Sequence, residues 1–196
     1  VDIQVVNQMV FMTIIMGVIL GASLLGGEET DGRLQALLTQ PVSRSRVYWH
    51  KYSAMAVLLL LATLGIFLGV ILGAVPIGEL SAIALDRLLF ATLMTWLITL
   101  VFATLAFALG ASTGKRGMAG IVAGSLAFVT FMITTLASTA TVLEKINYLS
   151  PFHYFNTPSV VKTGIDSGNV ITLVVIISVL ALVGWLIFRT RDIYQR

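Results

Sequence analysis

The sequence predicts an all-α fold: a polytopic membrane helix bundle with five spans and one short helix on the cytoplasmic side. Composition gives the first indication, because 58% of the residues are hydrophobic and only 11% are charged, whereas soluble domains carry about 25% charged residues. The charges also divide the chain into five uncharged runs, each longer than the roughly 20 residues that cross a hydrocarbon core. Because lipid offers no hydrogen-bond partners, each run should satisfy its own backbone groups as a helix.

These runs define a single transmembrane domain over residues 1–196, with one span in each run. The last run is rich in Val and Ile between residues 170 and 183, a composition that favours strands in water. The need for internal backbone hydrogen bonds in lipid still predicts a helix there. The predicted spans cover, in order, about 5–25, 52–75, 88–110, 118–142 and 168–188.

Lysine and arginine residues are distributed unevenly between the two sides of this arrangement. Four lie in 28–51, two at 115–116 and three in the C-terminal tail, whereas the other side holds Arg87, Lys145 and Lys162. The positive-inside rule therefore places 28–51 and the C-terminus in the cytoplasm, in a multi-pass protein of the cell membrane. Five spans with that orientation leave the N-terminus outside, so we expect at least one further span before Val1 in the natural protein, which makes six.

Small residues recur four apart in four of the five spans, a spacing that lets helix backbones approach closely in lipid. Packing within the chain is the simplest explanation, and a dimer or gating surface is the alternative. The stripes are Gly17 and Gly21; Gly65, Gly69 and Gly73; Ala106, Gly110 and Gly114; and Gly120 and Gly124.

The segment 28–51 is the longest water-soluble stretch of the chain. Acidic residues come first, followed by a short amphipathic turn in which Leu34, Leu37 and Leu38 fall on one helical face. Pro41 ends that turn, because proline lacks an N–H and disfavours helical geometry at the residue before it. The leucine face needs either a partner protein or the bilayer surface to cover it. The acidic start argues against an anionic lipid surface and favours a protein.

A second unusual segment, 144–167, lies on the outer side. It contains two prolines and four aromatic residues, so it is too apolar for a simple solvated loop and too broken to span the membrane. We expect a re-entrant or interfacial piece, and an ordinary loop with interfacial aromatic residues is the alternative.

Hydroxyl groups supply most of the polar character inside the spans, and they are candidates for lining a transport pathway. The alternative is that each Ser or Thr bonds back to its own helix. The candidate lining residues are Thr95, Thr99, Thr130, Thr134 and Ser138.

Several classes of chemistry are disfavoured. No span carries an ionisable residue in its interior, which argues against a proton-coupled carrier or a voltage sensor. The string from Gly110 to Lys115 is one residue short of a phosphate-binding loop and follows a span instead of a strand. His50 and His153 fall on opposite sides of the membrane and cannot share a metal. A net charge of +3 provides no basic face for nucleic acid. We therefore expect no catalytic residue, no metal and no cofactor in this chain.

The stretch 28–51 resembles the first cytoplasmic segment of the type-2 family of ATP-binding-cassette (ABC) permeases. The outer string from Leu149 to Phe152 also resembles the piece before the last span of that family. His50 and Arg33 depart from the glycine and threonine that are usual in the family at these positions. The residues that carry the main resemblance are Glu28, Glu29, Gly32, Leu34, Leu37, Leu38, Pro41, Val42, Ser43, Arg44 and Lys51.

The resemblance implies the membrane-spanning subunit of an ATP-driven transporter, with an exporter expected. A separate ATPase subunit would bind ATP and magnesium and dock on a coupling helix within residues 28–40, and a second permease copy or a paralogue would complete the pathway in the bilayer. A non-transporting scaffold or sensor that recruits a soluble partner through the same segment is the alternative. The implied docking residues are Glu28, Glu29, Gly32, Leu34, Leu37, Leu38, Pro41 and Arg44.

Overall fold

The computed structural model describes residues 3–32, 43–74, 85–137, 145–155 and 167–191. No strand occurs in these ranges, and five helices within them are long and apolar enough to cross a membrane. The predicted all-α polytopic bundle is therefore confirmed. The leucine face at Leu34, Leu37 and Leu38, together with Pro41 and Ser138, lies outside the described residues.

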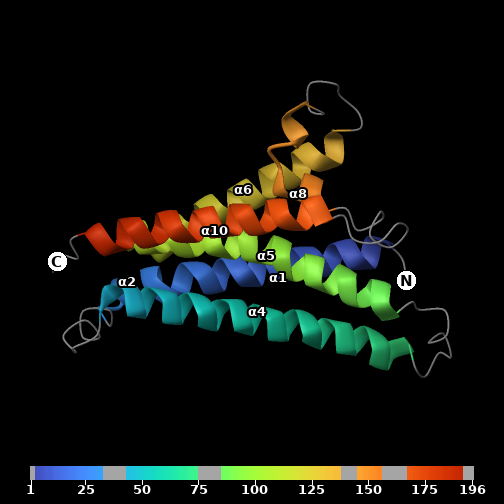
Figure 1. The fold of residues 1–196 in the computed structure, drawn as a ribbon, viewed down its shortest axis with the longest axis horizontal. Coiled ribbons are helices and arrows are strands. Elements are labelled where there is room, and N and C mark those ends of the chain that lie inside the picture. The colour runs from blue at the N-terminus through green and yellow to red at the C-terminus, as the bar shows by residue number, and fades with distance from the viewer. Residues whose placement is uncertain (1–2, 33–42, 75–84, 138–144, 156–166, 192–196) are drawn as a thin grey trace.

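The first helical unit is continuous and changes its winding near its end (Figure 1). A π-helical turn, η1, interrupts it, and such turns widen a helix locally and often occur at functional sites. Its parts are α1 (Ile3–Ala22), η1 (Ser23–Gly27) and α2 (Glu28–Thr30). The remaining elements are α4 (Arg44–Ala74), α5 (Leu85–Thr113), α6 (Arg116–Leu136), α8 (Pro151–Tyr154) and α10 (Ser167–Thr190).

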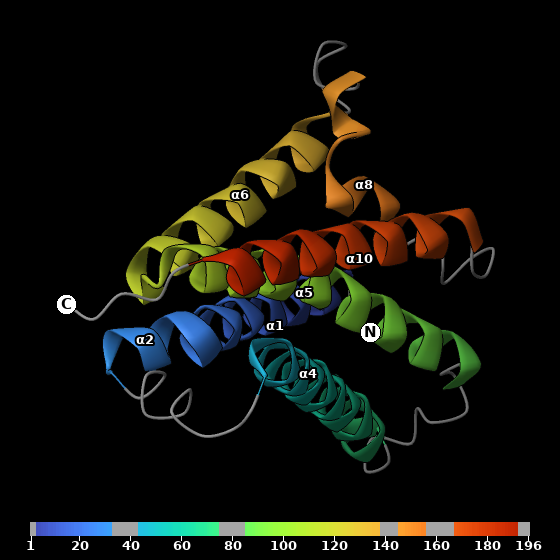
Figure 2. The ribbon, with the colours of Figure 1, turned by 60° about the vertical axis from the view of Figure 1, so that its left-hand side comes forward.

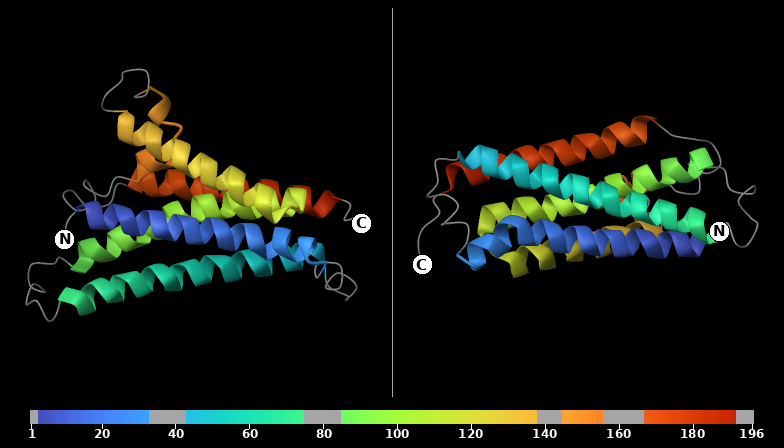
Figure 3. Two further views of the ribbon diagram at one scale, coloured as in Figure 1. Left: turned by 180° about the vertical axis from the view of Figure 1, so that it is seen from behind. Right: turned by 90° about the horizontal axis from the view of Figure 1, so that it is seen from below.

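The centre of the bundle is α5, which packs against α1, α4, α6 and α10. Residues 98–104 of α5 are buried without interruption, so this helix is enclosed on all sides over two turns. Seen from behind, α1 runs between α4 and α6 (Figure 3). The short helix α8 lies between the diverging ends of α6 and α10 (Figure 2).

Small residues allow α1 and α5 to approach each other closely. A Cβ atom added to Gly17 would stand 3.3 Å from the Ala103 Cβ and closer still to the Thr99 side chain, and one added to Gly21 would overlap the Ala103 carbonyl oxygen. In lipid such contacts are held by van der Waals packing, because there is no hydrophobic force between spans. The close fit follows from glycine at both positions.

The peripheral helices expose apolar faces, as expected where lipid covers them. In an apolar stretch of 18 residues, only 17% is buried inside the bundle in α4 and in α6. The same share is 56% in the first helix and 50% in α5. Leucine, isoleucine and valine side chains cover the exposed faces.

The structure shows α4 beginning earlier than the predicted span. The helix starts at Arg44, so residues 44–51, which the charge distribution places on the cytoplasmic side before the span, form its first two turns. Their side chains explain this, because Tyr48 is fully buried against Phe107 and Phe188 and no helix breaker occurs between Arg44 and Lys51.

Candidate functional site

Both flanks of the 33–42 segment lie at one end of the bundle, next to the end of α10 (Figure 1). Gly32 ends the first helical unit in a left-handed conformation, with φ of 73°, the geometry that glycine favours after a helix. Ser43 directly precedes α4, and its carbonyl accepts the Arg46 N–H at 2.9 Å. The sequence therefore sets both ends of the connection by its own helix-ending and helix-starting residues.

Glu28 and Glu29 each bind a cation from another part of the chain. Lys51 Nζ of α4 donates to Glu28 Oε1 at 2.6 Å. The guanidinium of Arg191, which follows α10, binds Glu29 through two nitrogens, with Nη1 3.0 Å from Oε2 and Nη2 on Oε1. Two-point contacts of this kind are among the strongest ion pairs, because the arginine fork matches the carboxylate.

Arg191 also makes two contacts besides Glu29. Its Nη1 donates to the Ala111 carbonyl of α5 at 3.0 Å, and its own carbonyl accepts a hydrogen bond from the Arg44 guanidinium. One residue thus joins the ends of α2, α4, α5 and α10. We call Glu28, Glu29, Arg44, Lys51 and Arg191 the charged clasp.

The turn between α5 and α6 is shaped around the Glu29 carboxylate. Gly114 has a φ of 68°, and a Cβ there would overlap the carboxyl group of Glu29. Its carbonyl also accepts a hydrogen bond from Thr30 Oγ1 at 3.3 Å. The string that superficially resembles a phosphate-binding loop is in fact the last turn of α5 followed by this glycine turn, because Gly114 N–H donates to the Gly110 carbonyl at 2.9 Å.

An aromatic layer beneath the clasp connects α4 to α10. The Tyr48 hydroxyl donates to the Ala181 carbonyl at 2.8 Å. Trp185 Nε1 donates to Ser45 Oγ at 3.1 Å, and the Arg189 guanidinium lies 5.7 Å from the centre of the Trp185 ring. Hydrogen bonds and a cation–π contact of this kind add to packing, so they help to hold the start of α4 against α10 next to the clasp.

The structure places half of the predicted docking residues. Glu28, Glu29, Gly32 and Arg44 lie together at the clasp, while Leu34, Leu37, Leu38 and Pro41 fall outside the described residues. Sequence reasoning missed Arg191, which was counted only as a charge of the C-terminal tail. The available signal was that two adjacent carboxylates close to a span end require cationic partners.

The predicted lining threonines bond mainly to nearby helix atoms. The Thr95 hydroxyl donates to the Ala91 carbonyl at 2.8 Å, and the Thr130 hydroxyl donates to the Leu126 carbonyl at 2.7 Å. Thr99 is fully buried, and its hydroxyl donates to Thr13 Oγ1 across the α1–α5 contact at 3.1 Å. A role for these residues in a pathway stays a prediction.

Thr134 helps to hold the segment that contains α8. Its hydroxyl lies 2.8 Å from both Asn147 Oδ1 and Ser150 Oγ. Ser150 caps α8 by accepting the Phe152 N–H at 3.2 Å. Phe152 is 5% exposed and sits among Phe11, Phe102 and Phe131. The described part of 144–167 therefore folds back onto the bundle through one inserted phenylalanine.

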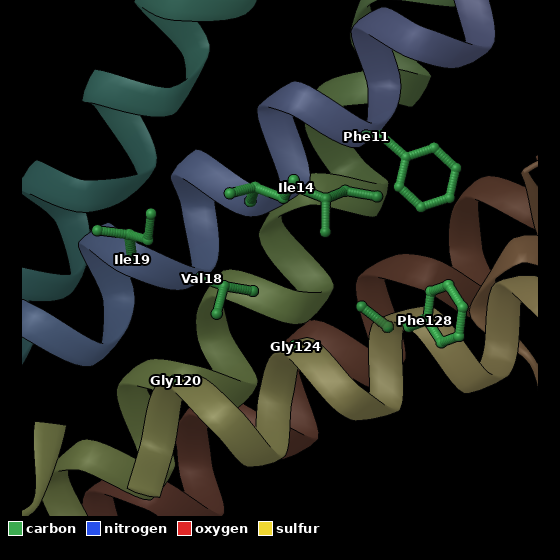
Figure 4. Close-up of a pocket in the computed structure, with 9 residues that line it drawn as sticks. Phe11, Ile14, Val18, Ile19, Gly120, Gly124 and Phe128 are labelled. Atoms are coloured by element: carbon green, nitrogen blue, oxygen red, sulfur yellow. The ribbon is translucent and has the colours of Figure 1, made fainter. Parts of the chain in front are cut away.

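An apolar groove of about 400 Å³ runs between α1 and α6 (Figure 4). Its lining carries no charged or hydroxyl side chain, so it can contact hydrocarbon but provides no group for polar recognition. None of the predicted lining threonines belongs to it. The lining residues are Phe11, Ile14, Ile15, Val18, Ile19, Gly120, Gly124, Ala127 and Phe128.

Metal-ligating residues do not gather in the part of the chain that the structure describes. No group of three or more His, Cys, Asp or Glu residues there could hold a metal ion. The described chemistry at the clasp consists of ion pairs and hydrogen bonds, which can fix or transmit positions between helices.

Comparison with known protein families shows which family this sequence belongs to. The sequence profile described as ABC-2 family transporter protein matches residues 3–193. The comparison with curated proteins returns no significant match. Together with five apolar helices of spanning length, a profile match over nearly the whole sequence shows that this chain belongs to the ABC-2 transporter family and is a membrane permease of an ABC transporter.

Proposed function

We propose that this chain is the permease subunit of an ATP-driven exporter and that residues 28–40 dock on a separate ATPase subunit. ATP and magnesium are bound by that subunit, and a second permease copy or a paralogue completes the pathway. The docking segment and the C-terminus face the cytoplasm.

The observation that carries this proposal is the anchoring of both flanks of 33–42. Glu28 and Glu29 on one side, and Arg44 and Lys51 on the other, are held by partly buried ion pairs and hydrogen bonds. A segment that receives a push from another protein needs rigid flanks, because flexible ones absorb the movement. The leucine face between these flanks has the spacing of a docking helix.

The arrangement of the spans also supports alternating access. Motion between two states requires elements that can pack in two discrete ways. The central α5 is enclosed, while α4 and α6 expose most of their surface, so movement at the periphery leaves the core intact.

The test is the triple substitution Leu34→Ser, Leu37→Ser and Leu38→Ser in the permease co-expressed with its ATPase subunit. We expect membrane insertion to be unchanged, co-purification of the ATPase subunit to be lost, and vanadate-sensitive ATP hydrolysis by the purified permease fraction to fall to background. The reason is that the apolar anchors of such a helix supply most of its binding energy.

A matched control makes the same kind of change, an apolar side chain to serine, at the opposite end of the bundle. Ile146→Ser and Leu149→Ser change two exposed apolar side chains and should leave co-purification and hydrolysis as in the unmodified protein. Undiminished co-purification of the triple variant would contradict the docking assignment. Flux across reconstituted membranes without nucleotide would contradict the ATP-driven mechanism.

A further inference from the structure

The end of α10 is attached to both flanks of residues 33–42, although α10 is far from them in sequence. Glu29 binds the Arg191 guanidinium, and Arg44 donates to the Arg191 carbonyl. The first of these contacts spans 162 positions and the second 147. A displacement of Glu29 and Arg44 together therefore acts on Arg191, the residue directly after α10.

The chemistry of the contact suits the transmission of force. The Glu29 side chain is 16% exposed and that of Arg191 is 22% exposed, so solvent and salt screen the pair less than they screen a surface ion pair. A two-point guanidinium–carboxylate contact also fixes the angle between the groups as well as their distance. Gly114 closes the remaining side, since a Cβ there would overlap the carboxylate.

A second ion pair in the clasp has a different geometry. Lys51 and Glu28 join α4 to α2, which are the two flanks themselves, and neither residue belongs to α10. Both pairs join a cation to a carboxylate, but the lysine makes a one-point contact and the two pairs connect different elements. This difference allows a structural effect to be separated from a transmitting one.

Resting on the docking function proposed above, we propose that Arg191 is a positioning residue that carries movement of the docking segment to α10. When the ATPase subunit shifts the flanks, Glu29 and Arg44 move Arg191, and α10 moves as a rigid helix from that end. Lys51 holds the flanks together and does not take part in this transfer.

The experiment measures movement of α10 directly. The chain has no cysteine, so spin labels can be attached at Ile171→Cys on α10 and Leu85→Cys on α5, both exposed. The complex with the ATPase subunit is placed in lipid nanodiscs, and the distance between the labels is compared without nucleotide and with ATP and vanadate. We expect a nucleotide-dependent change in the distance.

Arg191→Gln should remove most of that change while the ATPase subunit still co-purifies and hydrolyses ATP. Arg191→Lys, which keeps the charge but loses the fork, should give an intermediate response. The control Arg189→Gln, which removes the neighbouring charge, should keep the full change. Lys51→Gln, which breaks the pair between the two flanks, should lower the change less than Arg191→Gln does. Glu29→Gln attacks the same contact from α2 and should also remove most of the distance change; because Glu29 is itself a predicted docking residue, unchanged co-purification and ATP hydrolysis are expected of Arg191→Gln alone.

Three results would overturn the inference. These are an unaltered distance change in Arg191→Gln, no change in the unmodified complex that still hydrolyses ATP, or failure of both Arg191→Gln and Glu29→Gln to fold, since the pair would then be purely structural. Failure of the unmodified permease to bind any ATPase subunit would instead refute the docking function itself.

Discussion

Two glycine stripes with the same spacing have opposite surroundings in this bundle. Gly17 and Gly21 of α1 are buried against Thr99 and Ala103 of α5. Gly65, Gly69 and Gly73 of α4 face open space: apart from the chain neighbours and the nearby backbone of α4 itself, no described atom lies within 4 Å of the position that a Cβ would take. A four-residue spacing of glycines thus shows where another helix could pack closely. Whether one does depends on the arrangement of the neighbouring helices.

The difference follows from how α4 runs along the bundle. Its buried side chains, from Val47 to Thr63, all belong to its first part, and none of residues 64–73 is buried. Figure 3 shows α4 on the opposite side of α1 from α6, and the hydrogen bonds of α4 with α10 lie near its start, at Ser45 and Tyr48. The glycines of α4 are therefore available to lipid or to a second permease copy, whereas those of α1 are already used within the chain.

The largest expected effect tests the α1 stripe. In Gly21→Val the new Cβ would overlap the Ala103 carbonyl oxygen, which is backbone and cannot turn aside. We expect a cost at or above the upper end of the about 1–3 kcal/mol typical of overpacked cores, with loss of monodisperse protein in detergent. Fluorescence-detected size-exclusion chromatography after a temperature series measures it.

The control for this variant is the same substitution in the other stripe. Gly69→Val should shift the Tm of the isolated subunit little, in line with the about ±0.5 kcal/mol of unconstrained surface positions. Equal loss in both variants would show that α4 packs against something outside the described contacts. A loss confined to the assembled transporter would indicate that a second copy covers the α4 stripe.

The second prediction asks whether the contrast between buried and lipid-facing positions holds for aromatic residues. Phe152 is 5% exposed among three phenylalanines, while Phe128 on α6 is 60% exposed. Phe152→Ala should destabilise the subunit by about 3 kcal/mol, the lower end for buried phenylalanine, because lipid can fill part of the cavity. Phe128→Ala should leave thermal unfolding nearly unchanged, and a comparable drop there would contradict the burial contrast.

These contrasts show which parts of the structure could be predicted from the sequence. The five spans follow from local composition, because lipid requires each uncharged run to satisfy its own backbone. The contact between Glu29 and Arg191 depends on how helices that are distant in the chain pack. Two sequence patterns of equal spacing, in α1 and α4, differ only in that packing. Residues 44–51 lie in the segment that its charges predict to be water-soluble, and the burial of Tyr48 there depends on Phe107 of α5 and Phe188 of α10.

The third prediction concerns the first turns of α4. There α4, like α1, buries side chains against its neighbours, whereas its later part is exposed. Tyr48 is fully buried and its hydroxyl donates to the Ala181 carbonyl of α10 at 2.8 Å. Tyr48→Phe keeps the ring and removes this bond, so we expect a loss of about 1 kcal/mol in thermal unfolding. Tyr148→Phe, at an exposed ring, serves as the control. An unchanged Tm for Tyr48→Phe would mean that ring packing alone secures α4.

The smallest expected effect separates packing from hydrogen bonding at the α1–α5 contact. Thr99 donates to Thr13 across the two helices, whereas Thr95, one turn earlier, donates to the Ala91 carbonyl of its own helix. Valine has nearly the shape of threonine, so Thr99→Val should cost about 0.6 kcal/mol, the average for hydrogen bonds between spans. Thr95→Val should cost less, because the Ala91 carbonyl keeps its helical partner. Equal costs for the two variants would show that the glycine-mediated fit, and not the hydroxyl pair, sets the distance between α1 and α5.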